Sequence, residues 1–183
     1  MRRSNSGLFW PVLVLVATID FCTKALAVSR LIPQRLPHDV FGGWLRFTLV
    51  YNPGAAFGLN VGLYSRWIFM GLTFIALVIL GWLYAATRPG DVWRTLSLAL
   101  VCGGALGNLI DRIRWSDGVV DFVDIGFGDA RWPTFNLADM AVSIGACMLA
   151  WVLWGEDAEP DAVAAAPGAA AALAGVGESP ELH

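Results

Sequence analysis

Charged and metal-binding residues are scarce in this chain of 183 residues. Only 15% of the residues are charged, and there are two histidines, His38 and His183. The three cysteines show no CxxC spacing, so neither a disulfide framework nor a cysteine zinc site is expected. Two isolated histidines exclude paired-histidine haem and HExxH zinc chemistry. No basic cluster indicates nucleic acid, and no internal repeat indicates the commonest transporter architecture. We expect no cofactor, metal or nucleic acid.

Apolar residues are abundant instead, at 57% of the chain. Residues 67–86 contain no charge, and about 20 apolar residues suffice for a helix to cross a bilayer. Segments 8–28, 92–110 and 135–155 are also apolar, although ionisable groups interrupt each of them. We expect the first span to be retained, because "DFCTK" follows it where a signal peptide has small residues. The prediction is an all-α membrane protein with a four-transmembrane-helix bundle.

The connections between these spans differ in character. In the first connection Leu45, Phe47, Leu49 and Tyr51 alternate with other residues, which predicts a small β element at the membrane surface. Residues 87–91 read as a turn, which makes the second and third spans antiparallel neighbours. Residues 156–183 are rich in Ala, Gly, Pro and acid, so we expect a membrane domain over 1–155 and a disordered tail over 156–183.

Four antiparallel crossings bring several polar residues to one face of the bundle. These are Asp20, Asn52, Asp111, Asp121 and Asp139. Arginines are also more numerous on this face, and a positive-inside count alone would make it cytoplasmic. Arginines within an acidic site serve its chemistry first, so the charge count leaves the orientation open.

Asp121 and Asp139 are the candidate catalytic pair. Asp121 has apolar neighbours in "VVDFVD", and Asp139 lies close to the start of the last span, where it could instead simply cap the helix. Two carboxyl groups that share a site hold one proton between them near neutral pH, which is how aspartic proteases activate water. Asp124 has a similar setting and is the rival to Asp121.

Further polar residues admit structural or functional interpretations. Asp20 and Lys24 are four residues apart and can form an ion pair on one helix, with Lys24 either structural or extended to the membrane interface. Asp111 and Arg112 either close a helix end as an ion pair or order the substrate. Asn52, beside Pro53 in a turn, could reach a peptide carbonyl.

Five strings together resemble the bacterial lipoprotein signal peptidase family, signal peptidase II. They are "DFCTK" at 20–24, "YNPGAAFG" at 51–58, "GGALGNLIDRI" at 103–113, "GVVDFVD" at 118–124 and "FNLADMAVSIG" at 135–145. The resemblance implies a multi-pass aspartyl endopeptidase of the bacterial inner membrane, with an extracytoplasmic β element and its site towards that face. Such an enzyme removes signal peptides from diacylglyceryl-modified prolipoproteins by cutting before the lipidated cysteine.

The resemblance also assigns residues. It makes Asp121 and Asp139 the catalytic dyad, and its other motif positions, expected to bind substrate, are Asp20, Lys24, Asn52, Gly54, Gly104, Gly107, Asn108, Asp111, Arg112, Asn136 and Ala138. Expected partners are prolipoproteins and membrane lipid, with the chain itself a monomer. The alternative from another class is a small membrane transporter or proton-conducting protein with intramembrane carboxylates. A non-enzymatic scaffold would explain the hydrophobicity but not the convergent acids and amides.

Overall fold

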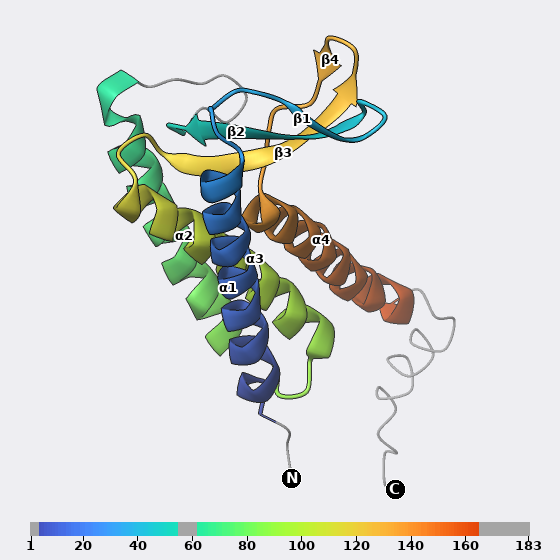
Figure 1. Cartoon of the computed structure of the whole chain (residues 1–183). Coiled ribbons are helices and arrows are strands. Elements are labelled where there is room, and N and C mark those ends of the chain that lie inside the picture. Colours follow the sequence, from blue (N-terminus) through green and yellow to red (C-terminus); the bar gives the residue numbers. More distant parts are fainter. Residues whose placement is uncertain (1–3, 55–61, 165–183) are drawn as a thin grey trace, which may run out of the picture.

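The computed structural model describes residues 4–54 and 62–164 and consists of four long helices and a small sheet (Figure 1). The helices are α1 (Ser6–Arg30), α2 (Ser65–Ala85), α3 (Val92–Arg114) and α4 (Leu137–Ala164). The strands are β1 (His38–Phe41), β2 (Leu45–Asn52), β3 (Val119–Phe127) and β4 (Ala130–Arg131), and a short 3₁₀ turn, η2 (Gly62–Tyr64), precedes α2.

All four helices are long and apolar enough to cross a membrane, as the sequence predicts. Their positions match the four expected spans, with bounds that differ by a few residues. The helix α4 continues to Ala164, and so includes the first part of the segment expected to be disordered. Residues 165–183 lie outside the described part of the chain, so disorder there stays a prediction.

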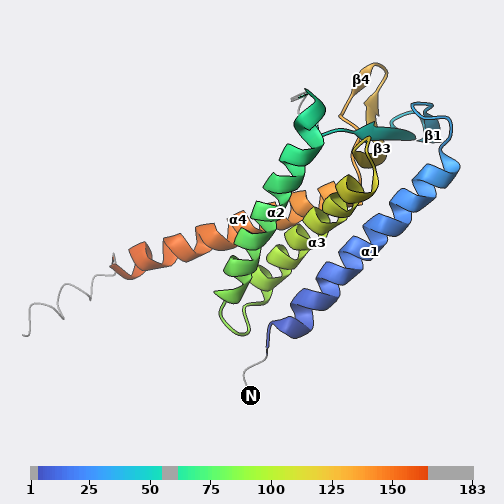
Figure 2. The ribbon, with the colours of Figure 1, turned by 90° about the vertical axis from the view of Figure 1, so that its left-hand side faces the viewer.

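The central helix of the bundle is α3, which packs against α1, α2 and α4. Close packing depends on glycines: a Cβ on Gly104 would collide with the backbone of Ala138 in α4, and one on Gly107 would collide with the Asp20 carboxylate. Small residues allow helices in a membrane to approach in this way. Towards its C-terminal end α4 diverges from the other three helices (Figure 2).

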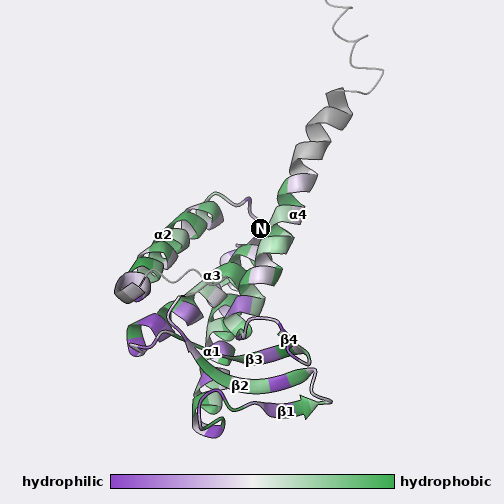
Figure 3. Cartoon of the chain, turned by 90° about the horizontal axis from the view of Figure 1, so that it is seen from above, coloured by the Kyte–Doolittle hydropathy of each residue, from purple (hydrophilic) through white to green (hydrophobic). Residues whose placement is uncertain are grey.

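The sheet lies across one end of the bundle, where α1 and α3 end and α2 and α4 begin (Figure 1). Its strands are antiparallel in the order β1-β2-β3-β4, with Val50 opposite Asp121 in the β2–β3 pair. The predicted alternating segment forms β2. The strands β3 and β4 were not predicted from the sequence; they come from the third connection and complete the sheet (Figure 3).

Two small clusters of buried side chains hold these parts together. Phe9 of α1 packs with Leu98, Ala99 and Cys102 of α3 within the bundle. At the other end, Ala27 of α1 packs with Phe122 and Val123 of β3, so burial of apolar side chains docks the sheet on the helix ends. This docking fixes the position of Asp121, which adjoins Phe122.

Candidate active site

Asp121 and Asp139 are brought together by the β3 strand and the first turn of α4. Asp121 is 2% exposed, whereas Asp139 is half-buried. Asn136 links the two: its Nδ2 donates to Asp121 Oδ1 at 2.7 Å, and its backbone N–H donates to Asp139 Oδ2 at 3.2 Å. The two acids therefore share Asn136 as a hydrogen-bond donor.

Asp139 is also a helix cap, the alternative that its position suggested. The backbone N–H of Asp139 donates to Asn136 Oδ1 at 2.9 Å, which completes a reciprocal capping box at the start of α4. Asp139 therefore both caps α4 and lies near Asp121, because the cap holds its carboxylate at the end of the helix that faces β3.

Asn52 provides the second amide contact of Asp121. Its Nδ2 donates to Asp121 Oδ2 at 3.0 Å, and its Oδ1 accepts the N–H of Gly54 at 3.0 Å. Gly54 has a φ of 111°, in the region that favours glycine, and a Cβ there would also collide with Phe69. The turn after β2 thus orients the Asn52 amide towards the dyad. The rest of the "YNPGAAFG" string lies outside the described residues.

The environment of Asp121 favours its protonated form. Burial, and next the nearby charge of Asp139, raise the pKa of Asp121 to about 7 from an ordinary value of 3.8, against the opposing effect of the two amide donors. A carboxyl group with this pKa exists in both its protonated and its ionised form near neutral pH and can exchange a proton, which suits acid–base catalysis.

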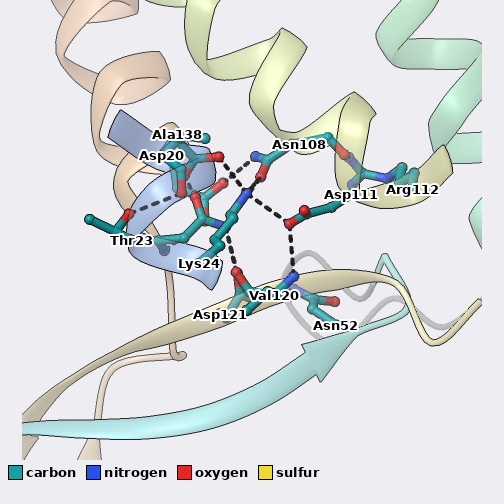
Figure 4. A network of polar contacts seen from close by, with 12 residues as sticks. Asp20, Thr23, Lys24, Asn52, Asn108, Asp111, Arg112, Val120, Asp121 and Ala138 are labelled. Carbon is teal, nitrogen blue, oxygen red and sulfur yellow. Dashed lines mark hydrogen bonds and ion pairs between the residues drawn. The ribbon is translucent and has the colours of Figure 1, made fainter. Parts of the chain in front are cut away.

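A second carboxylate group lies beside the dyad and surrounds Lys24 (Figure 4). Lys24 Nζ is 2.7 Å from Asp20 Oδ2 and 2.9 Å from Asp111 Oδ2. The predicted Asp20–Lys24 ion pair is confirmed. The alternative in which Lys24 extends to the membrane interface is wrong, because the residue is 3% exposed and ends between two buried acids.

Asn108 connects the two groups. Its Oδ1 accepts a hydrogen bond from Lys24 Nζ at 2.9 Å, and its Nδ2 donates to Asp139 Oδ1 at 2.8 Å. Because the lysine can only donate, it fixes which end of the Asn108 amide faces Asp139. Lys24 therefore orients a hydrogen-bond donor of the dyad without contacting the dyad itself.

Asp111 and Arg112 do not form the predicted ion pair with each other at the end of α3. Asp111 Oδ2 contacts Lys24 and accepts the N–H of Val120 at 3.1 Å, which ties β3 to the end of α3. Arg112 donates from Nη1 to the carbonyl of Asn108 at 3.2 Å. Its guanidinium is near enough to interact electrostatically with both dyad carboxylates as well as with Asp111.

The remaining predicted positions serve packing. Ala138 is fully buried, and its backbone N–H donates to Asp20 Oδ1 at 2.9 Å. Gly104 and Gly107 let α3 approach Ala138 and Asp20, as described above. These three residues bring helices α1, α3 and α4 together at the depth of the dyad.

Asp124, the rival of Asp121, has a different role. Its Oδ2 accepts from Thr48 at 3.1 Å, and its Oδ1 contacts Arg131 Nε at 2.8 Å. Arg131 also donates to the carbonyls of Gly43 and Gly126. Asp124 therefore joins β2, β3 and β4, away from the dyad. The roles of Thr48 and Arg131 were not predicted from the sequence, because they depend on the strand β3, which no sequence pattern indicated.

One cavity includes a dyad residue in its wall, and a second is lined by the sequence neighbours of Asn52. Asp139 itself lines a cavity of about 310 Å³, whose other walls are largely apolar and are formed by Trp132, Phe135, Met140, Ser143 and Ile144. On the side of α2, a cavity of about 660 Å³ is lined in part by Tyr51 and Pro53, the neighbours of Asn52. Among the described residues, no group of three His, Cys, Asp or Glu side chains could hold a metal ion.

Comparison with known proteins gives consistent results. Residues 12–155 match the family described as signal peptidase (SPase) II. The lipoprotein signal peptidase of Syntrophotalea carbinolica is 39% identical over 156 residues, which cover 84% of this chain and 95% of that protein. The lipoprotein signal peptidase of Moorella thermoacetica is 43% identical over 141 residues, 76% of this chain and 88% of that protein.

Solved structures show the same fold. A bacterial membrane enzyme determined at 2.3 Å resolution superimposes with a TM-score of 0.76 and 27% identity, covering 86% of this chain and 94% of that one. A second bacterial membrane enzyme gives a TM-score of 0.72 with 28% identity, over 83% of this chain and 96% of that one.

Proposed function

The chain belongs to the signal peptidase II family, and from this premise we propose that Asp121 and Asp139 together hydrolyse its substrate. The protein is a multi-pass bacterial membrane protease that removes signal peptides from prolipoproteins. The observation that carries the catalytic assignment is the Asn136 side chain and backbone held between the two carboxyl groups, one buried and one half-exposed.

The two acids take different parts in the reaction. The Asp139 carboxylate removes a proton from water as the water oxygen attacks the scissile carbonyl carbon, while Asp121 donates its proton to the carbonyl oxygen. When the C–N bond breaks, Asp139 returns its proton to the leaving nitrogen and the diol returns one to Asp121. Both acids end in their starting state, and no side chain becomes covalently attached to the substrate.

The raised pKa of Asp121 and the helix position of Asp139 support this division. Asp121 carries a proton near neutral pH. Asp139 receives N–H donors on both carboxylate oxygens and lies in the first turn of α4, where the helix dipole favours a negative charge. The remaining motif residues position the dyad or act on it electrostatically. Asn52, Asn108 and Asn136 donate hydrogen bonds to it, and Arg112 interacts with its charge. Asp20, Lys24 and Asp111 form an ionic group, and Gly54, Gly104, Gly107 and Ala138 act by packing.

We further propose that the sheet lies at the extracytoplasmic surface of the inner membrane. The start of α1, the α2–α3 turn and the last described turn of α4 lie at the end of the bundle away from the sheet (Figure 1). A substrate anchored in the bilayer would then meet the dyad near the outer leaflet, with the chain acting as a monomer.

The apolar cavity at Asp139 supports recognition of a lipid-modified substrate. Trp132, Met140 and Ile144 line this cavity and are exposed, and the last two lie on α4, a helix long enough to span the bilayer. Bound acyl chains would locate the scissile bond at the dyad and so lower the entropic cost of reaction.

The test uses the full chain and two forms of one prolipoprotein, with and without the diacylglyceryl group. We expect cleavage before the lipidated cysteine in the modified form and at least about a hundredfold lower kcat/KM for the unmodified form, because the lipid positions the substrate. Asp139→Asn is the control for contaminating proteases. Equal cleavage of both forms would instead indicate a general membrane protease.

No observation favours the transporter alternative. Phe9, near the start of α1, packs with Leu98, Ala99 and Cys102 in the first half of α3, so an apolar cluster lies on the side of the bundle away from the Asp20–Lys24–Asp111 group. Thr95 and Ser97, buried nearer that end, donate to helix carbonyls. The described residues therefore offer no continuous polar path.

A further inference from the structure

The polar cavity beside the dyad suggests a preference for part of the substrate that the family assignment does not specify. We propose that this cavity binds the segment of the substrate that follows the lipidated cysteine, and that it favours acidic side chains there. The proposal rests on the proposed function, since it requires the dyad to cut a prolipoprotein.

The cavity adjoins the dyad through β2. Tyr51 and Pro53 line it, and Asn52 between them donates to Asp121. The other walls come from the loop after α1, the start of α2 and the turn between α3 and β3, and they include Arg35, Arg66 and Asp117. A volume of about 660 Å³ suits a few amino-acid residues.

Positive charge exceeds negative charge among the described residues that line this cavity, with Arg35 and Arg66 against Asp117. Arg66 is held firmly: Nε donates to the carbonyl of Arg112 at 2.6 Å, Nη2 donates to that of Ile113 at 3.1 Å, and the guanidinium lies over the Trp67 ring. Carbonyl partners orient the guanidinium but leave its positive charge in place. The cavity thus presents a preorganised cation.

Arg35 is anchored through its backbone. Its N–H donates to the carbonyl of Leu49 in β2 at 2.9 Å, which joins the loop to the sheet. The residue has a φ of 62°, a conformation that any side chain with a Cβ finds costly. Replacement of Arg35 by another such residue therefore keeps the same backbone cost and changes mainly the charge.

The contrast between the two cavities determines which part of the substrate each receives. Asp139 lines the apolar cavity, and the polar one is lined by Tyr51 and Pro53, the neighbours of Asn52, which donates to Asp121. A prolipoprotein carries apolar segments, its signal helix and acyl chains, together with a water-soluble chain after the cysteine. The apolar groups match the first cavity, which leaves the polar, cationic cavity for the chain that follows the cut.

The test compares three diacylglyceryl-modified precursors that differ only at the second and third residues after the scissile bond, which are both Asp, both Ser or both Lys. With the wild-type chain we expect kcat/KM to be about two- to fivefold higher for the Asp precursor than for the Lys precursor, as for a partly solvated ion pair. The difference should shrink at high ionic strength.

Arg35→Glu should reverse this order, and Asp117→Arg should increase the preference for Asp. Arg30→Glu is the matched control, because Arg30 is exposed, lies on the same side of the bundle, gives the same change in net charge and does not line the cavity. The wild-type order should persist in this control. Thermal unfolding of each variant verifies that it folds. If Arg35→Glu does not fold, Asp117→Arg still tests the proposal.

Equal kcat/KM for all three precursors would overturn the proposal. So would an equal change of the Asp-to-Lys precursor preference in Arg35→Glu and Arg30→Glu. A third contrary result is that Arg35→Glu changes only the response of kcat/KM to anionic phospholipid vesicles. The last would assign the arginines to a lipid headgroup. Cleavage of the Ser precursor separates this proposal from the proposed function, because loss of the charge preference leaves that cleavage intact.

Discussion

Two groups of carboxylates lie side by side at the same end of the bundle and differ in their counter-charge. Asp20 and Asp111 contact Lys24, whereas neither Asp121 nor Asp139 forms a contact ion pair with any residue that the structure describes. Asn108 joins the two groups. Buried carboxylates must be compensated by a cation or by a proton, and each group uses a different one.

This difference in counter-charge indicates that the Lys24 group stabilises the fold, whereas the Asp121–Asp139 dyad can exchange protons. A lysine between two acids joins α1 and α3 through ion pairs, so the cation of that group has a structural role. The dyad is compensated partly by a proton on Asp121, whose pKa is raised to about 7, and a proton can move. Amide side chains provide its contact partners, and they orient the carboxylates without adding charge.

The largest effect is expected at the dyad. Asp121→Asn and Asp139→Asn should each lower kcat/KM by about 10²–10⁴-fold or more, because an amide keeps the shape of the side chain but cannot exchange a proton with water. The measurement is cleavage of a diacylglyceryl-modified precursor at matched membrane levels, with precursor binding as the control. Substantial cleavage by either variant would remove that residue from the catalytic pair.

The next largest effect is expected at Lys24, and it concerns stability. Lys24→Met leaves Asp20 and Asp111 buried without their cation, which should cost about 3–5 kcal/mol. Thermal unfolding in detergent measures the loss, and Arg88→Met at an exposed position is the control, expected within about 0.5 kcal/mol of wild type. If Lys24→Met unfolds like Arg88→Met, the ionic group does not hold the helices together.

Activity should depend on pH through the ionisation of Asp121. Because Asp121 must be protonated to donate to the carbonyl oxygen, kcat/KM should fall as pH rises through about 7 and Asp121 ionises. The expected slope is about tenfold per pH unit well above that value. The measurement is kcat/KM of the wild-type chain between about pH 6 and pH 9, with thermal unfolding at each pH as the control. A constant rate over that range, with the protein folded throughout, would contradict the assignment of the proton to Asp121.

The sequence predicts most members of the two carboxylate groups but not the contact between Lys24 and Asp111, and the reason is physical. Helical spacing places Lys24 beside Asp20, and antiparallel crossings place Asp111, Asp121 and Asp139 on one face. The partner of Asp111 was not predictable, because Lys24 reaches it only when glycines let α1, α3 and α4 approach closely.

The sheet shows the same limit. In β2 the apolar residues Leu45, Phe47, Leu49 and Tyr51 recur at every second position, so the strand could be predicted from the sequence. In β3 residues Val119 to Asp124 are all buried, so no alternation marks the strand and its aspartates look alike. Pairing with β2 and contact with Arg131 distinguish Asp124 from Asp121, and both depend on residues distant in the sequence.

The smallest effect is therefore expected at Asp124. Its carboxylate is already occupied by Thr48 and Arg131, and Asp124→Asn keeps one oxygen to accept hydrogen bonds while it removes the charge that pairs with Arg131. We expect a stability loss of about 1 kcal/mol and a kcat/KM within about threefold of wild type. Asp121→Asn, three residues earlier on the same strand, is the matched comparison. An inactive Asp124→Asn beside an active Asp121→Asn, at equal membrane levels, would exchange the two assignments, because it would place the exchangeable proton on the acid that the structure pairs with a cation.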